Sequence, residues 1–212
     1  MQKRFHIEGV GRFFIDYDRR RSGAGARMHL LIHDTAKGPL DITGFLPDGW
    51  RCEVVAGKGA RFQCHNQDRI VYVREQDITS MYGLVATLHE IGHARDTCSR
   101  AYWESRNPAS EYMRGEFMAH EFALGILDTL DMEDGVRRIC YIDIEEALAS
   151  HLPFAQRLIA TASKSSGIEE GLLRRELLTQ YVLWTNRHLR TREKRPALPW
   201  YTRFARYLAS AP

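Results

Sequence analysis

The pattern of hydrophobic and polar residues changes near residue 78 of the chain. Before it, segments rich in aromatic and β-branched residues, such as RFHIEGVGRFFIDYD and RMHLLIHD, alternate with Gly-, Pro- and Asp-containing turns, a pattern typical of short strands. The clearest strand is DRIVYVRE, residues 68–75, where alternate residues from Ile70 fall on one face and Val71 and Val73 fall on the other. We therefore expect a β-rich N-terminal half.

After residue 78 the apolar positions recur at helical spacing. Met81, Leu84, Val85, Leu88 and Ile91 repeat at steps of three and four residues, which predicts an amphipathic helix. This predicted helix directly follows the strand of residues 68–75.

Further helices are predicted along the rest of the chain. The next runs from about Ser110, a plausible N-cap with Pro108 just ahead, to Leu130. Residues 131–138 break the pattern, helices follow over 142–163 and 166–189, and a last short helix covers 201–209. Strands followed by helices predict an α+β fold. We expect one domain over residues 1–150 and a helical, basic C-terminal extension over residues 151–212.

Composition indicates a globular protein, with 44% hydrophobic and 27% charged residues. No stretch approaches the roughly 18 apolar residues that a membrane-spanning helix needs, and the first residues contain no apolar run of secretory length. We expect a soluble, cytoplasmic protein without a membrane partner.

The four cysteines, Cys52, Cys64, Cys98 and Cys140, form no C-x-x-C pair, which argues against a four-thiolate zinc site. Their spacings suggest no disulfide framework, so we interpret them as ordinary buried or semi-buried thiols.

Basic residues gather at the C-terminal end. Residues 171–212 contain nine Lys and Arg against two Glu, whereas the whole chain has a net charge of +3. Aromatic residues are interleaved with the arginines, and such a segment can bind nucleic acid or an acidic partner. The alternative is a solvated helix surface, in which Leu177, Tyr181 and Trp184 form a core stripe.

The stretch LVATLHEIGHARD, residues 84–96, contains the pattern His-Glu-x-x-His. Residues i and i+4 of a helix lie on one face, so His89 and His93 can reach one metal ion while Glu90 stays nearby without binding it. The alternative is a pair of ordinary helix histidines without any metal.

A catalytic zinc commonly has three protein ligands, so a third must come from elsewhere. In the second predicted helix, Glu116 falls inside the apolar arc and Glu121 falls outside it. A carboxylate on an apolar face is costly unless it is paired or binds a metal, which makes Glu116 the preferred ligand. A salt bridge to a neighbouring arginine is the alternative for Glu116. His120, one turn further, could instead be the third ligand or could orient a ligand by hydrogen bonding.

Over residues 66–130 the chain resembles the gluzincin metallopeptidases, most closely the small ImmA/IrrE-type peptidases. In those enzymes an edge strand, the HExxH helix and a helix bearing E-x-x-A-x-x-F-A form the core. The residues that carry the resemblance are His89, Glu90, His93, Glu116, Ala119, Phe122 and Ala123. The chain departs from the group at His120, where Asn or Asp is common, and it contains no recognisable helix-turn-helix region.

The resemblance implies zinc-dependent hydrolysis of a peptide bond in a peptide or a specific protein partner. His89, His93 and Glu116 would bind Zn²⁺, and Glu90 would be the general base. The donor that stabilises the oxyanion is expected among Tyr82, Tyr102, Tyr112 and His120, and Asp96 could accept a hydrogen bond from a ligand histidine. The alternative function is a non-catalytic zinc-binding regulatory module that acts through DNA or a protein partner.

Overall fold

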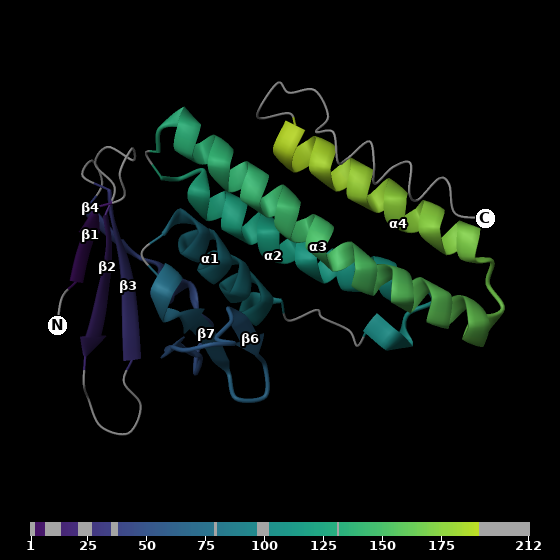
Figure 1. The fold of residues 1–212 in the computed structure, drawn as a ribbon, viewed down its shortest axis with the longest axis horizontal. Coiled ribbons are helices and arrows are strands. Elements are labelled where there is room, and N and C mark those ends of the chain that lie inside the picture. The colour runs from purple at the N-terminus through teal and green to yellow at the C-terminus, as the bar shows by residue number, and fades with distance from the viewer. Residues whose placement is uncertain are drawn as a thin grey trace. The chain divides into compact units, whose positions relative to one another are not determined.

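We analysed a computed structural model of the chain. It describes residues 3–6, 14–20, 27–34, 38–78, 80–96, 102–130 and 132–190, with side chains for those from residue 40 to residue 189. The chain is a mixed α+β protein, as the sequence predicted (Figure 1). The predicted helix over 201–209 and the residue Cys98 lie outside the described residues.

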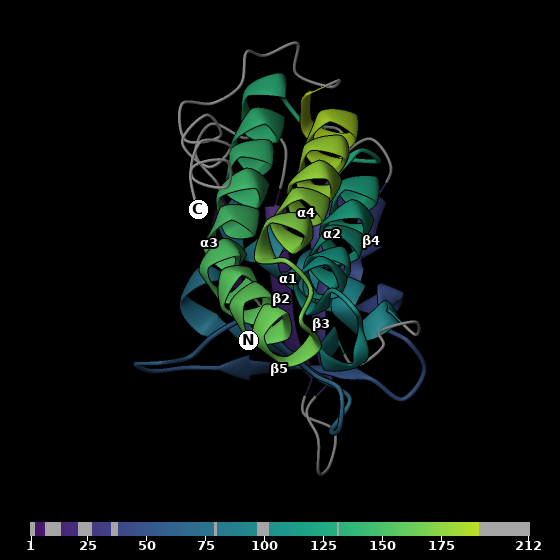
Figure 2. The ribbon, with the colours of Figure 1, turned by 90° about the vertical axis from the view of Figure 1, so that its right-hand side faces the viewer.

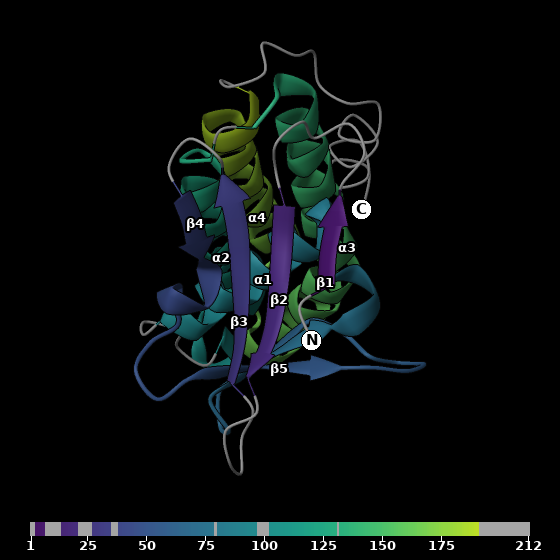
Figure 3. The same cartoon turned by 90° about the vertical axis from the view of Figure 1, so that its left-hand side faces the viewer.

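All the described strands precede residue 75 and form two sheets. The first is an antiparallel meander of four strands, which Figure 3 shows side by side: β1 (Lys3–His6), β2 (Phe14–Arg20), β3 (Arg27–Asp34) and β4 (Gly38–Asp41). The second has the order β5-β7-β6, with strands β5 (Arg51–Val55), β6 (Gln63–His65) and β7 (Ile70–Arg74). Strand β7 pairs in parallel with β5 and antiparallel with β6. The strand before the HExxH helix is therefore the central strand of its sheet, and the edges are β5 and β6.

The described part of the chain then contains four α-helices: α1 (Met81–Arg95), α2 (Pro108–Leu127), α3 (Asp134–Ser166) and α4 (Glu170–Thr185). Helix α4 continues as a π-helical turn over Asn186–Arg190. Single 3₁₀ turns precede or connect them at Ile42–Phe45, Glu75–Asp77 and Tyr102–Glu104. Helix α3 begins within the predicted break at 131–138 and continues past Pro153.

The chain divides into two compact units. Unit 1 contains residues 1–97 and 118–143, and unit 2 contains residues 98–117 and 144–212. Helices α2 and α3 each contribute residues to both units. The boundary predicted at residue 150 falls within α3, and the division into residues 1–150 and 151–212 stays a prediction.

The core of unit 1 lies where α1 packs against strands β6 and β7. Val71 and Val73 of β7 are fully buried, as are Leu84, Leu88 and Ile91 of α1. The alternation predicted for β7 and the apolar stripe predicted for α1 therefore meet in one core. Burial of each large aliphatic side chain contributes about 1.5–3 kcal/mol relative to exposure.

In unit 2, α4 packs against the first part of α2 (Figure 2). The predicted N-cap of α2 was wrong: the helix begins at Pro108, and the side-chain oxygen of Asn107 accepts a hydrogen bond from the Ser110 backbone at 3.2 Å. Proline suits the first helical position because its missing N–H would have no partner there. The Asn107 amide also donates to the Leu173 carbonyl at 3.2 Å and to the Glu176 carboxylate at 3.0 Å. One buried amide thus caps α2 and ties it to α4.

None of the described helices combines the length and the apolar character needed to cross a membrane.

Candidate metal centre

Helix α1 presents the first two candidate ligands. It begins after Ser80, whose hydroxyl accepts a hydrogen bond from the Gly83 backbone at 3.0 Å and caps the helix. Gly83 is required because a Cβ at this position would lie 1.9 Å from the Asp77 carbonyl oxygen. The sequence therefore fixes where α1 starts, and the helical repeat then places His89 and His93 one turn apart.

The two histidines face each other across that turn. Their Nε2 atoms lie 3.0 Å apart, and their rings meet edge to face with centroids 4.5 Å apart. His89 is only 8% exposed, and His93 is half-buried. The Nε2 atom of each ring is thus directed at the other, and the two are hydrogen-bonded.

Helix α2 carries the third candidate ligand. Glu116 is 6% exposed, whereas Glu121 is exposed, so the helical projection of the two acids is confirmed. Within unit 1, α1 and α2 approach very closely, because a Cβ on Gly92 would lie 2.7 Å from the Ala119 backbone. Ala119 is one turn from Glu116 on the same unbroken helix. The glycine on α1 and the small residue on α2 therefore determine how near the two backbones can come.

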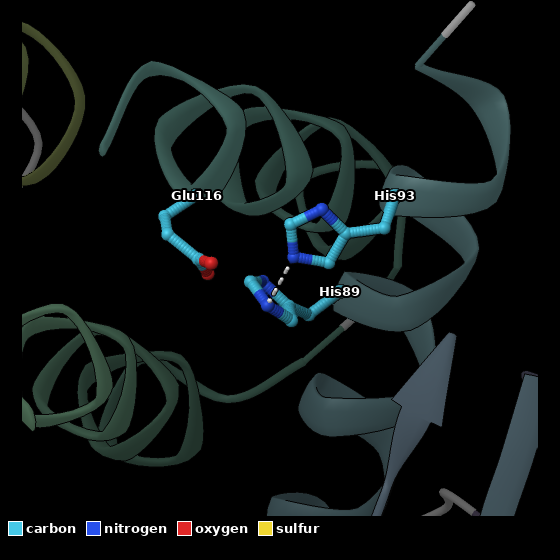
Figure 4. A group of neighbouring side chains, drawn as sticks. All are labelled: His89, His93 and Glu116. Carbon is cyan, nitrogen blue, oxygen red and sulfur yellow. Dashed lines mark hydrogen bonds between the residues drawn. The ribbon is translucent and has the colours of Figure 1, made fainter. Parts of the chain in front are cut away.

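His89, His93 and Glu116 form a group that could hold a metal ion (Figure 4), since their ligand atoms all lie within 4.8 Å of one another. Two ligands bound at about 2.0–2.1 Å in tetrahedral geometry lie roughly 3.3 Å apart, and the separation of the histidine nitrogens is 3.0 Å. Two imidazole nitrogens and one carboxylate oxygen are a ligand set that zinc accepts. The group could therefore hold a metal ion.

His120 lies beside this group, against His89. The two rings are tilted by 37° with centroids 4.0 Å apart, and His120 is 2% exposed. Among the described side chains, the metal-binding group is made of His89, His93 and Glu116. The geometry therefore favours Glu116 over His120 as the third ligand.

Glu90 is half-buried and acts electrostatically on Cys64 of strand β6. Burial, and then the negative charge of Glu90, raise the pKa of the Cys64 thiol to about 12. Glu90 therefore lies on the side of α1 that meets the edge strand β6. Cys52 and Cys140 are buried free thiols, also with pKa values raised to about 12, chiefly by burial. The interpretation of the cysteines as ordinary thiols is confirmed for these three.

Sequence reasoning missed His151, which α3 places next to Glu116 within unit 2. Its Nε2 atom lies 3.5 Å from Oε2 of Glu116, and its Nδ1 atom pairs with the Tyr112 hydroxyl. The pKa of Tyr112 is raised by burial, by the Glu116 charge and by a hydrogen bond to that carboxylate. The predicted alternative for Glu116 was a salt bridge to a neighbouring arginine, but the described neighbour of its carboxylate is His151, and Arg114 pairs with Glu111 at 2.7 Å. No local pattern marks His151, because its contact with Glu116 spans 35 residues.

The other predicted polar residues lie in varied surroundings. Tyr82 is 50% exposed and packs edge to face on Phe62, with the Arg74 guanidinium 5.9 Å from its ring centre. Tyr102 packs against Tyr112, with ring centroids 5.6 Å apart. Asp96 is the C-cap of α1, where its backbone N–H donates to the His93 carbonyl. Of the predicted tyrosines, Tyr112 is therefore the one in contact with a candidate ligand.

The aromatic residues of α4 are core residues. Tyr181 and Leu177 are fully buried, and Trp184 stacks on Phe117 with ring centroids 5.2 Å apart. The predicted core stripe is confirmed, so Tyr181 and Trp184 do not offer faces for stacking on bases. The remaining aromatics of the basic segment, from Trp200 onward, lie outside the described residues.

In comparisons with known proteins, no family model, no curated protein and no solved structure matched this chain.

Proposed function

We propose that this protein is a zinc-dependent peptidase that hydrolyses a peptide bond in a specific protein partner. The observation that carries the proposal is the convergence of His89, His93 and Glu116 from two helices. Glu90, the residue between the histidines, is in the position that the HExxH pattern gives to a general base. The resemblance to gluzincins supports the same reaction.

The three ligands would hold the ion, which when bound supplies a Lewis acid that lowers the pKa of water and polarises a carbonyl. Glu90 would accept the proton of the attacking water and deliver it to the leaving amine. His89 and Glu116 are each buried, which limits the motion of each side chain within its own unit. Each role is thereby assigned to a side chain whose position follows from α1 or α2.

The first experiment measures metal. Protein purified without added zinc is analysed by elemental mass spectrometry, for the wild type and for Glu90→Gln and His93→Ala. We expect one zinc per chain in the wild type and in Glu90→Gln, and loss of zinc in His93→Ala. A wild type without zinc or any other stoichiometric metal would contradict the proposal.

The second experiment measures hydrolysis. A cell lysate is incubated with wild type or with Glu90→Gln, and newly formed protein N-termini are labelled and identified by mass spectrometry. We expect a small set of cleavage sites that require Glu90 and disappear with a chelator. If wild type and Glu90→Gln, both loaded with zinc, produce the same N-termini, the peptidase hypothesis is wrong and the non-catalytic regulatory module is favoured.

A further inference from the structure

The side chains around Glu116 form a cluster that belongs entirely to unit 2. Tyr112 and Glu116 are four residues apart on α2, hence on one face of the helix, and His151 comes from α3. His151 is linked to both: Nδ1 to the Tyr112 hydroxyl, and Nε2 to Glu116 Oε2 at 3.5 Å. The Glu116 carboxylate also acts on the Tyr112 hydroxyl, since its charge contributes to the raised pKa of Tyr112. The three groups therefore close a ring of polar contacts.

Burial makes these contacts important for the carboxylate. The Glu116 side chain is 8% exposed, and that of His151 is 28% exposed. A buried carboxylate is stable only where donors or cations compensate for lost water. A glutamate side chain also has several rotatable bonds, so contacts at its tip remove alternative orientations before a metal binds.

Tyr112 is itself held in place by packing. Its ring meets Phe154 edge to face at 4.8 Å and Tyr102 at 5.6 Å. Phe154 follows His151 by three residues on α3, so the same helix supplies the histidine and the ring that holds the tyrosine. The hydroxyl that contacts Glu116 and His151 is therefore fixed by neighbours on two sides.

We propose that His151 and Tyr112 are positioning residues that hold the Glu116 carboxylate in the orientation required to bind the metal ion. A carboxylate has two oxygens, so a Glu116 side chain whose Oε2 lies 3.5 Å from Nε2 of His151 can still supply a ligand atom. Hydrogen-bonded partners of metal ligands typically change metal affinity by about 10–100-fold when they are removed. The inference rests on the metal centre of the proposed function and not on the reaction it performs.

The test compares variants of the full chain by zinc affinity. His151→Phe keeps a ring and removes both nitrogens, and Tyr112→Phe removes only the hydroxyl. His151→Gln keeps an N–H donor that can approach the carboxylate. The neighbouring variant Ser150→Ala is the matched control, because the Ser150 hydroxyl is exposed and donates only locally, to the Ala147 carbonyl.

Zinc dissociation constants are measured by competition with a chromophoric chelator, and Co²⁺ is added to metal-free protein to record the visible spectrum. We expect zinc affinity to fall about 10–100-fold in His151→Phe, less in Tyr112→Phe, and to recover substantially in His151→Gln. The Co²⁺ spectrum should change in intensity in His151→Phe, since the coordination by Glu116 changes. Ser150→Ala should match the wild type in both measurements.

Thermal unfolding of the metal-free proteins separates positioning from folding. Folded His151→Phe with wild-type zinc affinity and a wild-type Co²⁺ spectrum would overturn the positioning role and leave the zinc centre intact. Equal losses in His151→Phe and His151→Gln would also overturn it, because the donor would then be irrelevant. A wild type that binds neither metal would overturn both this inference and the proposed function.

Discussion

Helices α1 and α2 both carry candidate ligands, but they place them by different means. On α1, His89 and His93 are separated by one helical turn, so the helix alone brings their Nε2 atoms to 3.0 Å. On α2, Glu116 depends on contacts that the helix does not contain: the approach of Gly92 to Ala119 and the pairing with His151. The candidate metal centre therefore combines a locally determined half with a half determined by packing.

Removal of a ligand from either helix should have the largest effect. His89→Ala and Glu116→Ala should each lower zinc affinity by more than the roughly 100-fold seen for partners that merely support ligands. Competition with a chelator of known affinity measures this, with Glu121→Ala as the control on the exposed face of α2. Wild-type affinity in Glu116→Ala would exclude α2 from the metal centre.

The next largest effect should come from a substitution that disturbs the close approach of α1 and α2. Gly92→Ala should destabilise the protein by about 1–3 kcal/mol, because the added methyl meets the Ala119 backbone, which cannot move aside cheaply. Urea unfolding of the metal-free protein measures it. Gly115→Ala is the matched control: its Cβ would meet nothing within 4 Å, so better helix propensity should stabilise α2 by up to about 1 kcal/mol. Equal effects of the two substitutions would show that the helices do not meet at Gly92.

Removal of the N-terminal cap should cost less stability in α1 than in α2. Ser80→Ala removes a cap from α1 and should cost about 1 kcal/mol. Asn107→Ala should cost more, about 2 kcal/mol, because it removes the cap of α2 and the amide hydrogen bonds to α4. Asn107→Ser keeps a capping oxygen, so its loss of stability should lie between the losses caused by Ser80→Ala and Asn107→Ala. Denaturant unfolding measures the free energy of unfolding of all three variants. If Asn107→Ala loses no more stability than Ser80→Ala, the hydrogen bonds from Asn107 to α4 do not stabilise the protein.

The smallest predicted effect is a change in the alkylation rate of Cys64, which lies near Glu90 of α1. Alkylation follows the thiolate fraction, so labelling of Cys64 should be slow at neutral pH and rise as pH approaches about 12. Glu90→Gln removes the negative charge that disfavours the thiolate, so the Cys64 pKa should fall and labelling at a given pH should become faster. Burial remains, so the pKa should stay above its usual value of 9.0.

Peptide mass spectrometry after iodoacetamide treatment measures Cys64 separately from the other thiols. Cys140 serves as the internal control, because the Glu90 charge does not contribute to its raised pKa. Unchanged Cys64 labelling in Glu90→Gln would contradict the placement of Glu90 beside strand β6.

Much of the local structure was predictable because it depends on short-range periodicity. The alternation in β7, the stripe on α1 and the contrast between Glu116 and Glu121 all follow from side-chain direction within one element. Helix boundaries were less predictable: the start of α2 at Pro108 depends on Asn107, whose amide is buried only because α4 packs there. The beginning of α3 at Asp134 was likewise hidden in a segment that resembles a loop.

The sequence by itself determined that two histidines of the candidate metal centre share one face, since about four residues make one turn of any α-helix. It also identified Glu116 as an acid on an apolar face. Only the tertiary structure brings a ligand atom of Glu116 within 4.8 Å of those of the two histidines and places His151, 35 residues further along the chain, 3.5 Å from its carboxylate. Hydrophobic periodicity encodes which face of a helix is buried, but the packing of whole helices decides which polar groups meet there.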